Sequence, residues 1–194
     1  MIAREHILVV AATERELAIP DGWRTLRCGI GPVDAAAATA AAIASDRPLL
    51  LLHVGIAGVR RHAALDPPTL VIGSASLYCD LDVPEAWSPR TLPAPAELLA
   101  AAQRALPSAV VRSIGTSARV GGSTPCGTAC GVEAMEGFGV LRAAHLASVP
   151  ALEVRAISNH IEEHDRANWR FDAAFTAITT ATSLLVAEFL SCAP

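Results

Sequence analysis

Aromatic residues are scarce in this chain of 194 residues, at only 4% of positions. Proteins that hold single-stranded nucleic acid stack the bases on aromatic side chains, and few such platforms are available here. Charged residues make up 18% of the chain, the net charge is −4, and the arginines are scattered. No basic stripe indicates a nucleic-acid partner, so we expect none.

Cysteines are also few, and an odd number of them stands at irregular spacings: Cys28, Cys79, Cys126, Cys130 and Cys192. Cys126 and Cys130 have no second pair and no histidine at zinc-finger spacing. We therefore predict buried free thiols in a reducing compartment, no metal site, and a cytoplasmic location.

Long uninterrupted hydrophobic runs are missing as well. The run at residues 7–12 is too short, and too quickly followed by charge, for a signal peptide. The apolar segment 173–190 contains several threonines and has Asp172 and Glu188 at its edges. It predicts a packed terminal helix rather than a membrane span, so we expect no membrane partner.

What the chain does contain is a large apolar fraction, 52% of its residues, which is enough to build a full core. Short apolar runs typical of buried strands occur at residues 7–12, 49–54 and 151–157, and further strands are predicted at 24–28, 69–77 and 109–114. Helices are predicted after Thr13, at about 32–44, at 96–106, between Glu136 and Pro150, and at 171–190. The alternation predicts a single α/β domain over residues 1–194, with three layers in which helices flank a mixed, mainly parallel sheet.

Three connecting segments stand out between these elements. We predict an irregular loop over 78–95 with Trp87 as its anchor, and a solvated loop at 60–62. A Gly/Ser/Thr/Cys-rich loop over 115–131 precedes a polar stretch, and a loop of this length suggests a wall or lid of a site.

Polar residues follow several of the predicted strands, where ligands bind in open α/β sheets. Glu16 comes after the first strand and could either face a pocket or close a capping box with Thr13. Glu133 and Glu136 precede a helical pattern and could likewise be helix-start residues. Asn159 follows the last strand, where an asparagine turn is the alternative.

The order of motifs resembles the nucleoside phosphorylase and nucleosidase superfamily over nearly the whole chain. The resemblance rests on AATERE, GIGPVDAA, HVGIAG, VIGSASLYCDLD, VEAMEG and VRAISN. It implies a nucleoside phosphorylase-like fold and an enzyme that cleaves the N-glycosidic bond of a purine nucleoside, without any cofactor. Relatives in this superfamily are homo-oligomers, so we expect one here.

The resemblance implies roles for the residues around the sugar. Glu136 would accept hydrogen bonds from the 2′ and 3′ hydroxyls of a ribose, which suits its two oxygens. Met135 would pack its thioether against the apolar face of the sugar. Glu133 either touches the ribose or only starts the helix, and we include it among the substrate-binding residues.

It also implies roles around the reacting bond and the base. Glu16 matches the position that holds the attacking water in nucleosidases. Ala57 and Gly58 would line the base and sugar pocket, and Asn159 would face N7 of the purine. Arg155 lies inside a predicted strand, and we expect it to pair with a carboxylate rather than to contact the substrate.

Two departures from better-known relatives bear on the reaction. His53 stands where phosphorylases have a phosphate-gripping arginine, and a neutral histidine supplies little for phosphate, so we favour water as the nucleophile. Asn159 replaces the aspartate of adenine-specific nucleosidases, and a neutral amide complements a 6-oxopurine.

Together with SNHIEEHDRANW, this combination looks most like the futalosine hydrolases, which release hypoxanthine from futalosine on a route to menaquinone. The alternatives are another purine nucleosidase or phosphorylase, acting on inosine or methylthioadenosine, and a silent purine-nucleoside-binding protein.

Overall fold

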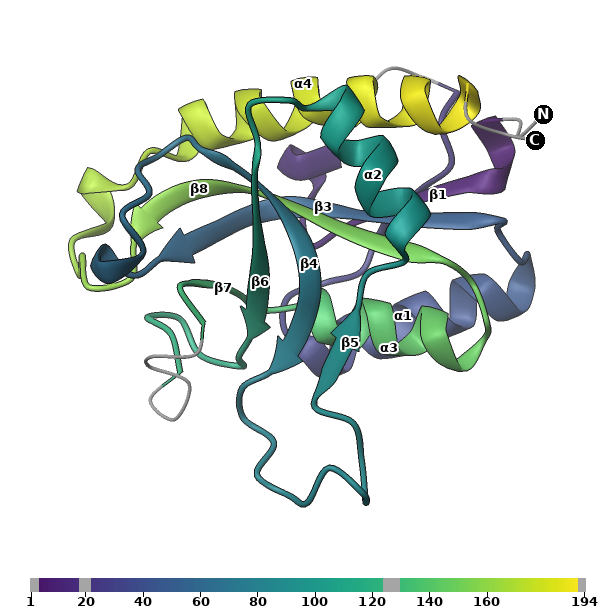
Figure 1. The fold of residues 1–194 in the computed structure, drawn as a ribbon, viewed down its shortest axis with the longest axis horizontal. Coiled ribbons are helices and arrows are strands. Elements are labelled where there is room, and N and C mark those ends of the chain that lie inside the picture. Colours follow the sequence, from purple (N-terminus) through teal and green to yellow (C-terminus); the bar gives the residue numbers. More distant parts are fainter. Residues whose placement is uncertain (1–3, 18–21, 124–129, 192–194) are drawn as a thin grey trace.

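The computed structural model describes residues 4–17, 22–123 and 130–191 (Figure 1). Within these ranges the strands are β1 Ile7–Ala11, β2 Thr25–Arg27, β3 Leu50–Val59, β4 Leu70–Tyr78, β5 Thr91–Pro93, β6 Val110–Thr116, β7 Val132–Ala134 and β8 Ala151–His160. The α-helices are α1 Pro32–Ser45, α2 Ala96–Ala105, α3 Gly137–Leu146 and α4 Phe171–Ser191. Short 3-10 helices cover Arg4–His6, Glu14–Leu17, Arg61–Ala63 and Arg166–Asn168.

The strands form one mixed sheet. β1 pairs in parallel with β2 and β3, and β3 pairs in parallel with β8. β4 is parallel to β6 but antiparallel to β5 and β8, and β7 is parallel to β6 but antiparallel to β3. The predicted α/β class, with a mainly parallel mixed sheet and flanking helices, is confirmed.

Five of the strands close into a ring, because β3 pairs with β8, β8 with β4, β4 with β6, β6 with β7, and β7 again with β3. Apolar side chains from all five strands pack together as one cluster: Ala57, Val59, Val71, Ile114, Val132, Ala134 and Ile157. The ring is thus a small barrel with a packed interior, and only β1, β2 and β5 extend outside it.

The two faces of the open part of the sheet carry different helices (Figure 1). Alternate residues of β1 separate between them: Ile7, Val9 and Ala11 join the core with α2 and α4. Leu8 and Val10 join the core with α1 and α3. This is the two-residue alternation of a strand buried on both faces, and it produces the predicted three layers.

β3 and β8 are longer than their apolar runs predicted. β3 continues through Gly55–Gly58 to Val59, and β8 runs through Ser158 and Asn159 to His160. The two strands pair along this whole length, with an irregularity between Ala57 and Gly58. The small residues of β3 and the polar residues of β8 were expected to follow the strands, but cross-strand hydrogen bonds keep them within the sheet.

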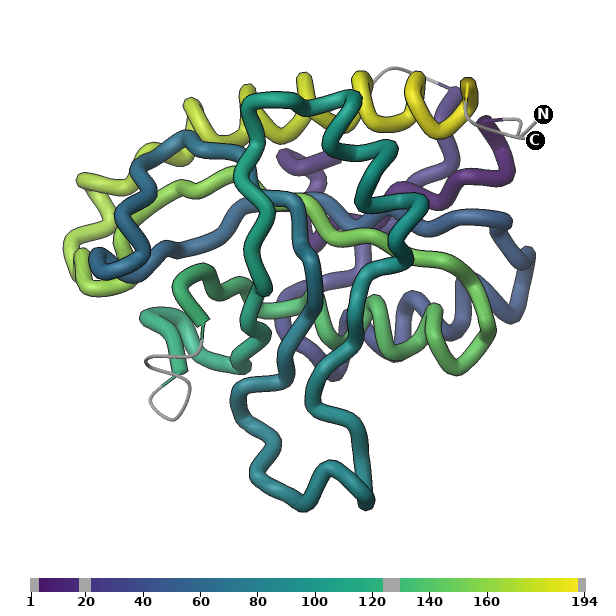
Figure 2. Tube along the Cα trace, in the orientation of Figure 1, coloured from purple at the N-terminus to yellow at the C-terminus, as the bar shows by residue number. Residues whose placement is uncertain are grey.

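Three local predictions are wrong in whole or in part. The α-helix expected after Thr13 is, in the described residues, the 3-10 helix Glu14–Leu17. The segment between β4 and β5 projects from the body (Figure 2), and Trp87 within it is 79% exposed, so it anchors nothing there. In the loop predicted to be solvated at 60–62, Arg61 and His62 are exposed, but Arg60 is not, because its guanidinium forms an ion pair with Glu133.

α4 is long and apolar enough to cross a membrane by length and composition. One side of it nevertheless packs on the sheet and α2, with Ala174, Ile178, Ala181, Thr182, Leu185, Val186 and Phe189 buried. It is the packed terminal helix that the sequence predicted.

Cys28 and Cys130 are buried free thiols, as predicted, and Cys79 is buried as well. Burial, reinforced by the nearby Glu136 carboxylate, raises the pKa of Cys28 to about 12, so this thiol stays protonated and unreactive. Cys126 and Cys192 lie outside the described residues.

Candidate active site

A cavity of about 410 Å³ opens at the carboxyl ends of β1, β3 and β8, next to β7. All seven site residues predicted from the sequence line it: Glu16, Ala57, Gly58, Glu133, Met135, Glu136 and Asn159. The volume is in the range of sites for small ligands. Parallel strands end at a common edge, and for this reason residues far apart in the sequence meet here.

Glu16 is a buried carboxylate held by donors on both oxygens. Its Oε2 accepts from Thr13 N–H at 2.9 Å and from the Thr13 hydroxyl at 2.7 Å, while Oε1 accepts from Ile56 N–H at 3.1 Å. Both readings of the sequence therefore apply, since the carboxylate caps its own 3-10 helix and also lines the cavity. The bond to Ile56 ties it to β3 and fixes its direction.

Gly55 on β3 pairs with Arg155 on β8, and it lies where the side chains of Arg155 and Glu16 approach each other. A Cβ on Gly55 would overlap Arg155 Nη1 and lie 2.7 Å from Glu16 Oε1. Arg155 is fully buried, and its Nη1 has no hydrogen-bond partner among the described residues. The missing side chain thus leaves room for a guanidinium N–H beside the carboxylate.

Adding a methyl group at this point, Gly55→Ala, is expected to lower kcat for base release about 10- to 100-fold, since displacement of catalytic groups by about 1 Å can cost 10²-fold. Steady-state kinetics on purified protein tests this. Gly73→Ala is the matched control, because its methyl would meet the Glu153 carbonyl at 3.1 Å and no cavity-lining residue. Equal losses in both variants would show a general effect of strand strain.

Glu136 lies just before α3 and is 5% exposed. Its Oε1 accepts from Gly31 N–H at 3.2 Å, and its Oε2 lies 3.7 Å from Arg155 Nη2. Burial raises its pKa, against the opposing effect of the Arg155 guanidinium. Glu136 is the N-cap residue of α3, so it does stand at a helix start, but its side chain makes no capping bond to the helix.

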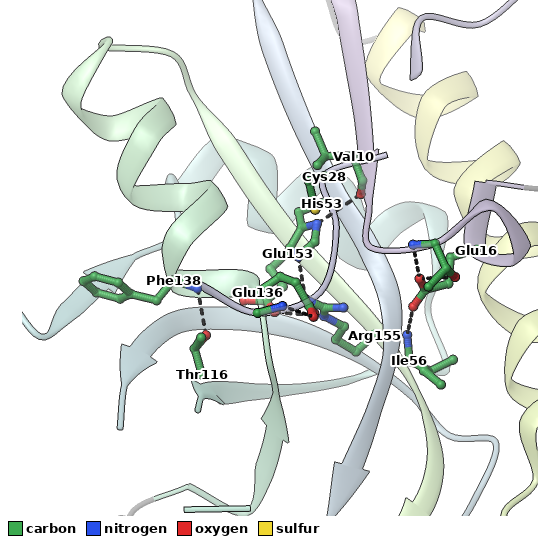
Figure 3. A network of polar contacts seen from close by, with 12 residues as sticks. Val10, Glu16, Cys28, His53, Ile56, Thr116, Glu136, Phe138, Glu153 and Arg155 are labelled. Carbon is green, nitrogen blue, oxygen red and sulfur yellow. Dashed lines mark hydrogen bonds and ion pairs between the residues drawn. The ribbon is translucent and has the colours of Figure 1, made fainter. Parts of the chain in front are cut away.

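Arg155 is the centre of a buried polar network (Figure 3). Its Nε donates to Glu153 Oε1 at 2.9 Å, and its Nη2 donates to His53 Nε2. The predicted pairing of Arg155 with a carboxylate is confirmed. Because Glu153 and His53 hold the guanidinium from behind, it points towards Glu16 and Glu136 with little freedom to move.

His53 is fully buried and does not line the cavity. Its Nδ1–H donates to Val10 O at 3.0 Å, which leaves Nε2 as the acceptor for Arg155. Burial, and next the Arg155 charge, hold its pKa well below the ordinary 6.5. A neutral, inward-facing ring offers nothing to a phosphate in the cavity.

This buried histidine predicts an acid-sensitive fold. The unfolded chain protonates His53 below about pH 6.5 while the native chain does not, so the free energy of unfolding falls on acidification, by up to about 1.4 kcal/mol per pH unit. Burial raises the pKa of Glu136 and Glu153, which gives the opposite slope. Denaturant titrations between pH 7.5 and 5 measure the free energy of unfolding. On acidification this free energy should fall less steeply in His53→Asn than in the wild type. Parallel curves would contradict this origin.

The irregular pairing of β3 with β8 sets the position of Asn159. Ile157 pairs with Ala57 and Asn159 with the next residue, Gly58, so Ser158 is the extra residue of a bulge. Asn159 Nδ2 donates to His160 O at 3.0 Å, and its Oδ1 accepts from the Ser158 hydroxyl at 2.7 Å. A carbonyl can only accept, which fixes the orientation of the amide and leaves one N–H unused.

Glu133 lies in β7 rather than at a helix start. Its Oε1 accepts from Arg60 Nη2 at 2.6 Å and Nε at 3.0 Å, and its Oε2 accepts from Ser123 N–H at 2.6 Å. Both oxygens are therefore engaged in holding the segment before residue 124 against β3. Sequence reasoning missed Arg60, and no local pattern identifies a partner 73 residues away.

Among the residues that the structure describes, no group of three or more His, Cys, Asp or Glu side chains could hold a metal ion. Three buried carboxylates line the cavity, of which Glu133 is ion-paired with Arg60, and the neutral amide of Asn159 lies beside them. The other two carboxylates are Glu16 and Glu136. Such a set can hold a water, a diol and a heterocyclic base.

Residues 25–191 match the model of the phosphorylase superfamily. The chain belongs to this superfamily. The predicted superfamily is thereby confirmed, and with it the predicted class of enzyme, a nucleoside N-glycosidase.

Particular members of the phosphorylase superfamily are similar in sequence or in fold. The futalosine hydrolase of Streptomyces coelicolor is 37% identical over 201 residues, covering 86% of this chain and 80% of that protein. The S-adenosylhomocysteine nucleosidase of Streptococcus pyogenes has a TM-score of 0.82 at 20% identity, covering 97% of each chain. The futalosine hydrolase structure of Helicobacter pylori has a TM-score of 0.81 at 17% identity, covering 97% of this chain and 98% of that one. These two structures show the common fold.

Proposed function

We propose that this chain hydrolyses the N-glycosidic bond of futalosine, releasing hypoxanthine and dehypoxanthine futalosine in menaquinone biosynthesis. The observation that carries the proposal is one cavity lined by the Glu16 carboxylate and the Asn159 amide. His53, which matches the phosphate-binding arginine of related phosphorylases, is buried and neutral and does not line this cavity. The 37% identity to a futalosine hydrolase supports the choice of substrate.

In the proposed reaction Glu16 orients a water and takes its proton as general base. The bond from the water oxygen to C1′ forms as the bond from C1′ to the purine N9 breaks, and the electron pair of that bond goes to the base. A carboxylate has about four lone-pair sites, and the three hydrogen bonds that Glu16 accepts from protein leave one of them for a water. The unpartnered Nη1 of Arg155 gives this side of the site a fixed positive charge.

Glu136 accepts hydrogen bonds from the two ribose hydroxyls, and Met135 covers the apolar face of the sugar.

Asn159 donates its unused N–H to N7 and so stabilises the charge that develops on the leaving base. An amide cannot supply the proton itself, so the base acquires it through water. Ala57 and Gly58 line the cavity next to Asn159, where small residues leave space for a flat heterocycle. Glu133 is better assigned to holding the cavity wall than to direct contact with ribose.

The test is base release from futalosine, inosine and methylthioadenosine, with and without phosphate, followed by chromatography. We expect hypoxanthine from futalosine at a rate that phosphate does not change. Adenine release from methylthioadenosine would contradict the role given to Asn159, and a phosphate requirement would contradict that given to His53. Binding of futalosine without release of base would favour a silent nucleoside-binding protein.

We also infer a homo-oligomer in the cytoplasm. Exposed apolar residues lie beside the cavity, with Ile30 62% and Val120 52% exposed, and contact with a second copy would cover them. Sedimentation equilibrium tests this inference.

A further inference from the structure

The cavity has a buried end and an exposed mouth with different chemistry. Glu16, Glu136 and Asn159 at the buried end are at most 7% exposed. With the water, the diol and the base assigned to these three residues, the 5′ carbon of the nucleoside is the position left to point towards the mouth. Any substituent at that carbon therefore meets the side chains of the mouth.

Three aromatic side chains form a row at the mouth. Trp169 and Phe171 have ring centroids 5.4 Å apart at 45°, and Phe171 and Phe175 have centroids 6.2 Å apart at 14°. All three are half-buried and line the cavity. In a chain with only eight aromatic residues, this row is a concentrated surface for a flat apolar group.

Arg15 lies over the far end of this row and also lines the cavity. Its guanidinium carbon is 4.3 Å from the Phe175 centroid, and its Nη2 donates to Asp172 Oδ1 at 2.9 Å. The ion pair is exposed, at 64% and 95% for the two side chains, and such pairs stabilise little. Asp172 occupies one of the five N–H donors, so others remain for a ligand.

We propose that Arg15 is a specificity-determining residue, which binds the carboxylate of an aryl group attached at the 5′ position. The inference rests on the proposed function and adds the residue that recognises the 5′ substituent. An aromatic ring would stack along Trp169, Phe171 and Phe175, and its carboxylate would meet the guanidinium in a charged hydrogen bond. A 5′-phosphate fits less well, because its charge would lie against the aromatic row.

Two 5′-substituted inosines test the proposal. One carries a 3-carboxyphenyl group on a short linker, and the other carries a phenyl group on the same linker. The measured quantity is the ratio of their kcat/KM values, with the ratio of their Kd values from calorimetry beside it. The wild type is expected to prefer the carboxylate by about 10- to 100-fold, the range that a charged hydrogen bond supplies.

Three variants separate recognition from structure. Arg15→Gln should bring the preference close to one. Asp172→Asn breaks the same ion pair but keeps the guanidinium, so it should retain the preference. Arg104→Gln removes another ion pair between an arginine and α4, the one with Glu188 at 2.8 Å, which lies outside the cavity. This variant should also retain the preference.

The outcomes distinguish this proposal from the proposed function. Base release from both inosines at equal rates, or a preference that survives in Arg15→Gln, would overturn the role of Arg15 and leave the hydrolase standing. Loss of the preference in Asp172→Asn would show that Arg15 acts only by joining its 3-10 helix to α4. If no base is released from any nucleoside, the proposed function fails, and the Kd ratio alone decides the role of Arg15.

Discussion

Glu16→Gln is expected to lower kcat for hypoxanthine release by about 10²- to 10⁴-fold with little change in KM, which is the usual contribution of a general base. The amide cannot take the proton of the attacking water. It also places an NH₂ group opposite either Ile56 N–H or the donors of Thr13, where only acceptors fit. Initial-rate kinetics over a range of substrate concentrations separates kcat from KM.

Glu14→Gln is the control for the loss of Glu16, because Glu14 is an exposed glutamate in the same 3-10 helix and does not line the cavity. It should keep wild-type kcat. Thermal unfolding of both variants shows whether any loss comes from the fold. A large rise in KM with kcat intact in Glu16→Gln would assign this carboxylate to substrate binding instead of water activation.

Glu136→Gln is expected to lower kcat/KM by about 10²- to 10⁴-fold, because the two charged hydrogen bonds proposed between Glu136 and the ribose would contribute about 1.5–3 kcal/mol each. To isolate the contribution of the 2′ hydroxyl, the wild type and the variant are compared on the substrate and on its 2′-deoxy analogue. The wild type should already turn it over poorly, and the variant should lose much less on it than on the full nucleoside.

Glu97→Gln is the matched control for Glu136, since Glu97 is an exposed glutamate in the first turn of α2, away from the cavity. It should leave kcat/KM unchanged. Equal losses on the ribo- and deoxyribonucleosides would contradict a contact with the 2′ hydroxyl. They would point instead to the partners of Glu136 within the protein, Gly31 and Arg155.

Much of the fold could be predicted from local patterns. Apolar runs identified the longer strands, because a strand buried on both faces is apolar at successive positions and so stands out as a continuous run. Glu16 and Asn159 could be assigned to one site from two facts: each lies near the end of a strand, and parallel strands end at one edge. The motifs then supplied the register between distant segments.

The rest depends on contacts between distant parts of the chain. β3 extends past Gly55 only because β8 pairs with it, and the short β7 forms only by joining β3 to β6. The partnership of Arg60 with Glu133 and the position of Gly55 between Glu16 and Arg155 likewise exist only in the folded chain. Neither a residue's type nor its neighbours along the sequence identifies such a partner.

β8, the last strand of the described residues, lies between β3 and β4, which follow each other in the sequence. During synthesis these two strands emerge long before their shared neighbour, so until β8 is made each presents an open strand edge. Insertion of the last strand closes both edges and at the same moment brings Arg155 and Asn159 into the site. The barrel and the active site are therefore completed in one late, non-local step, and a nascent chain that lacks this strand is exposed to edge-to-edge aggregation.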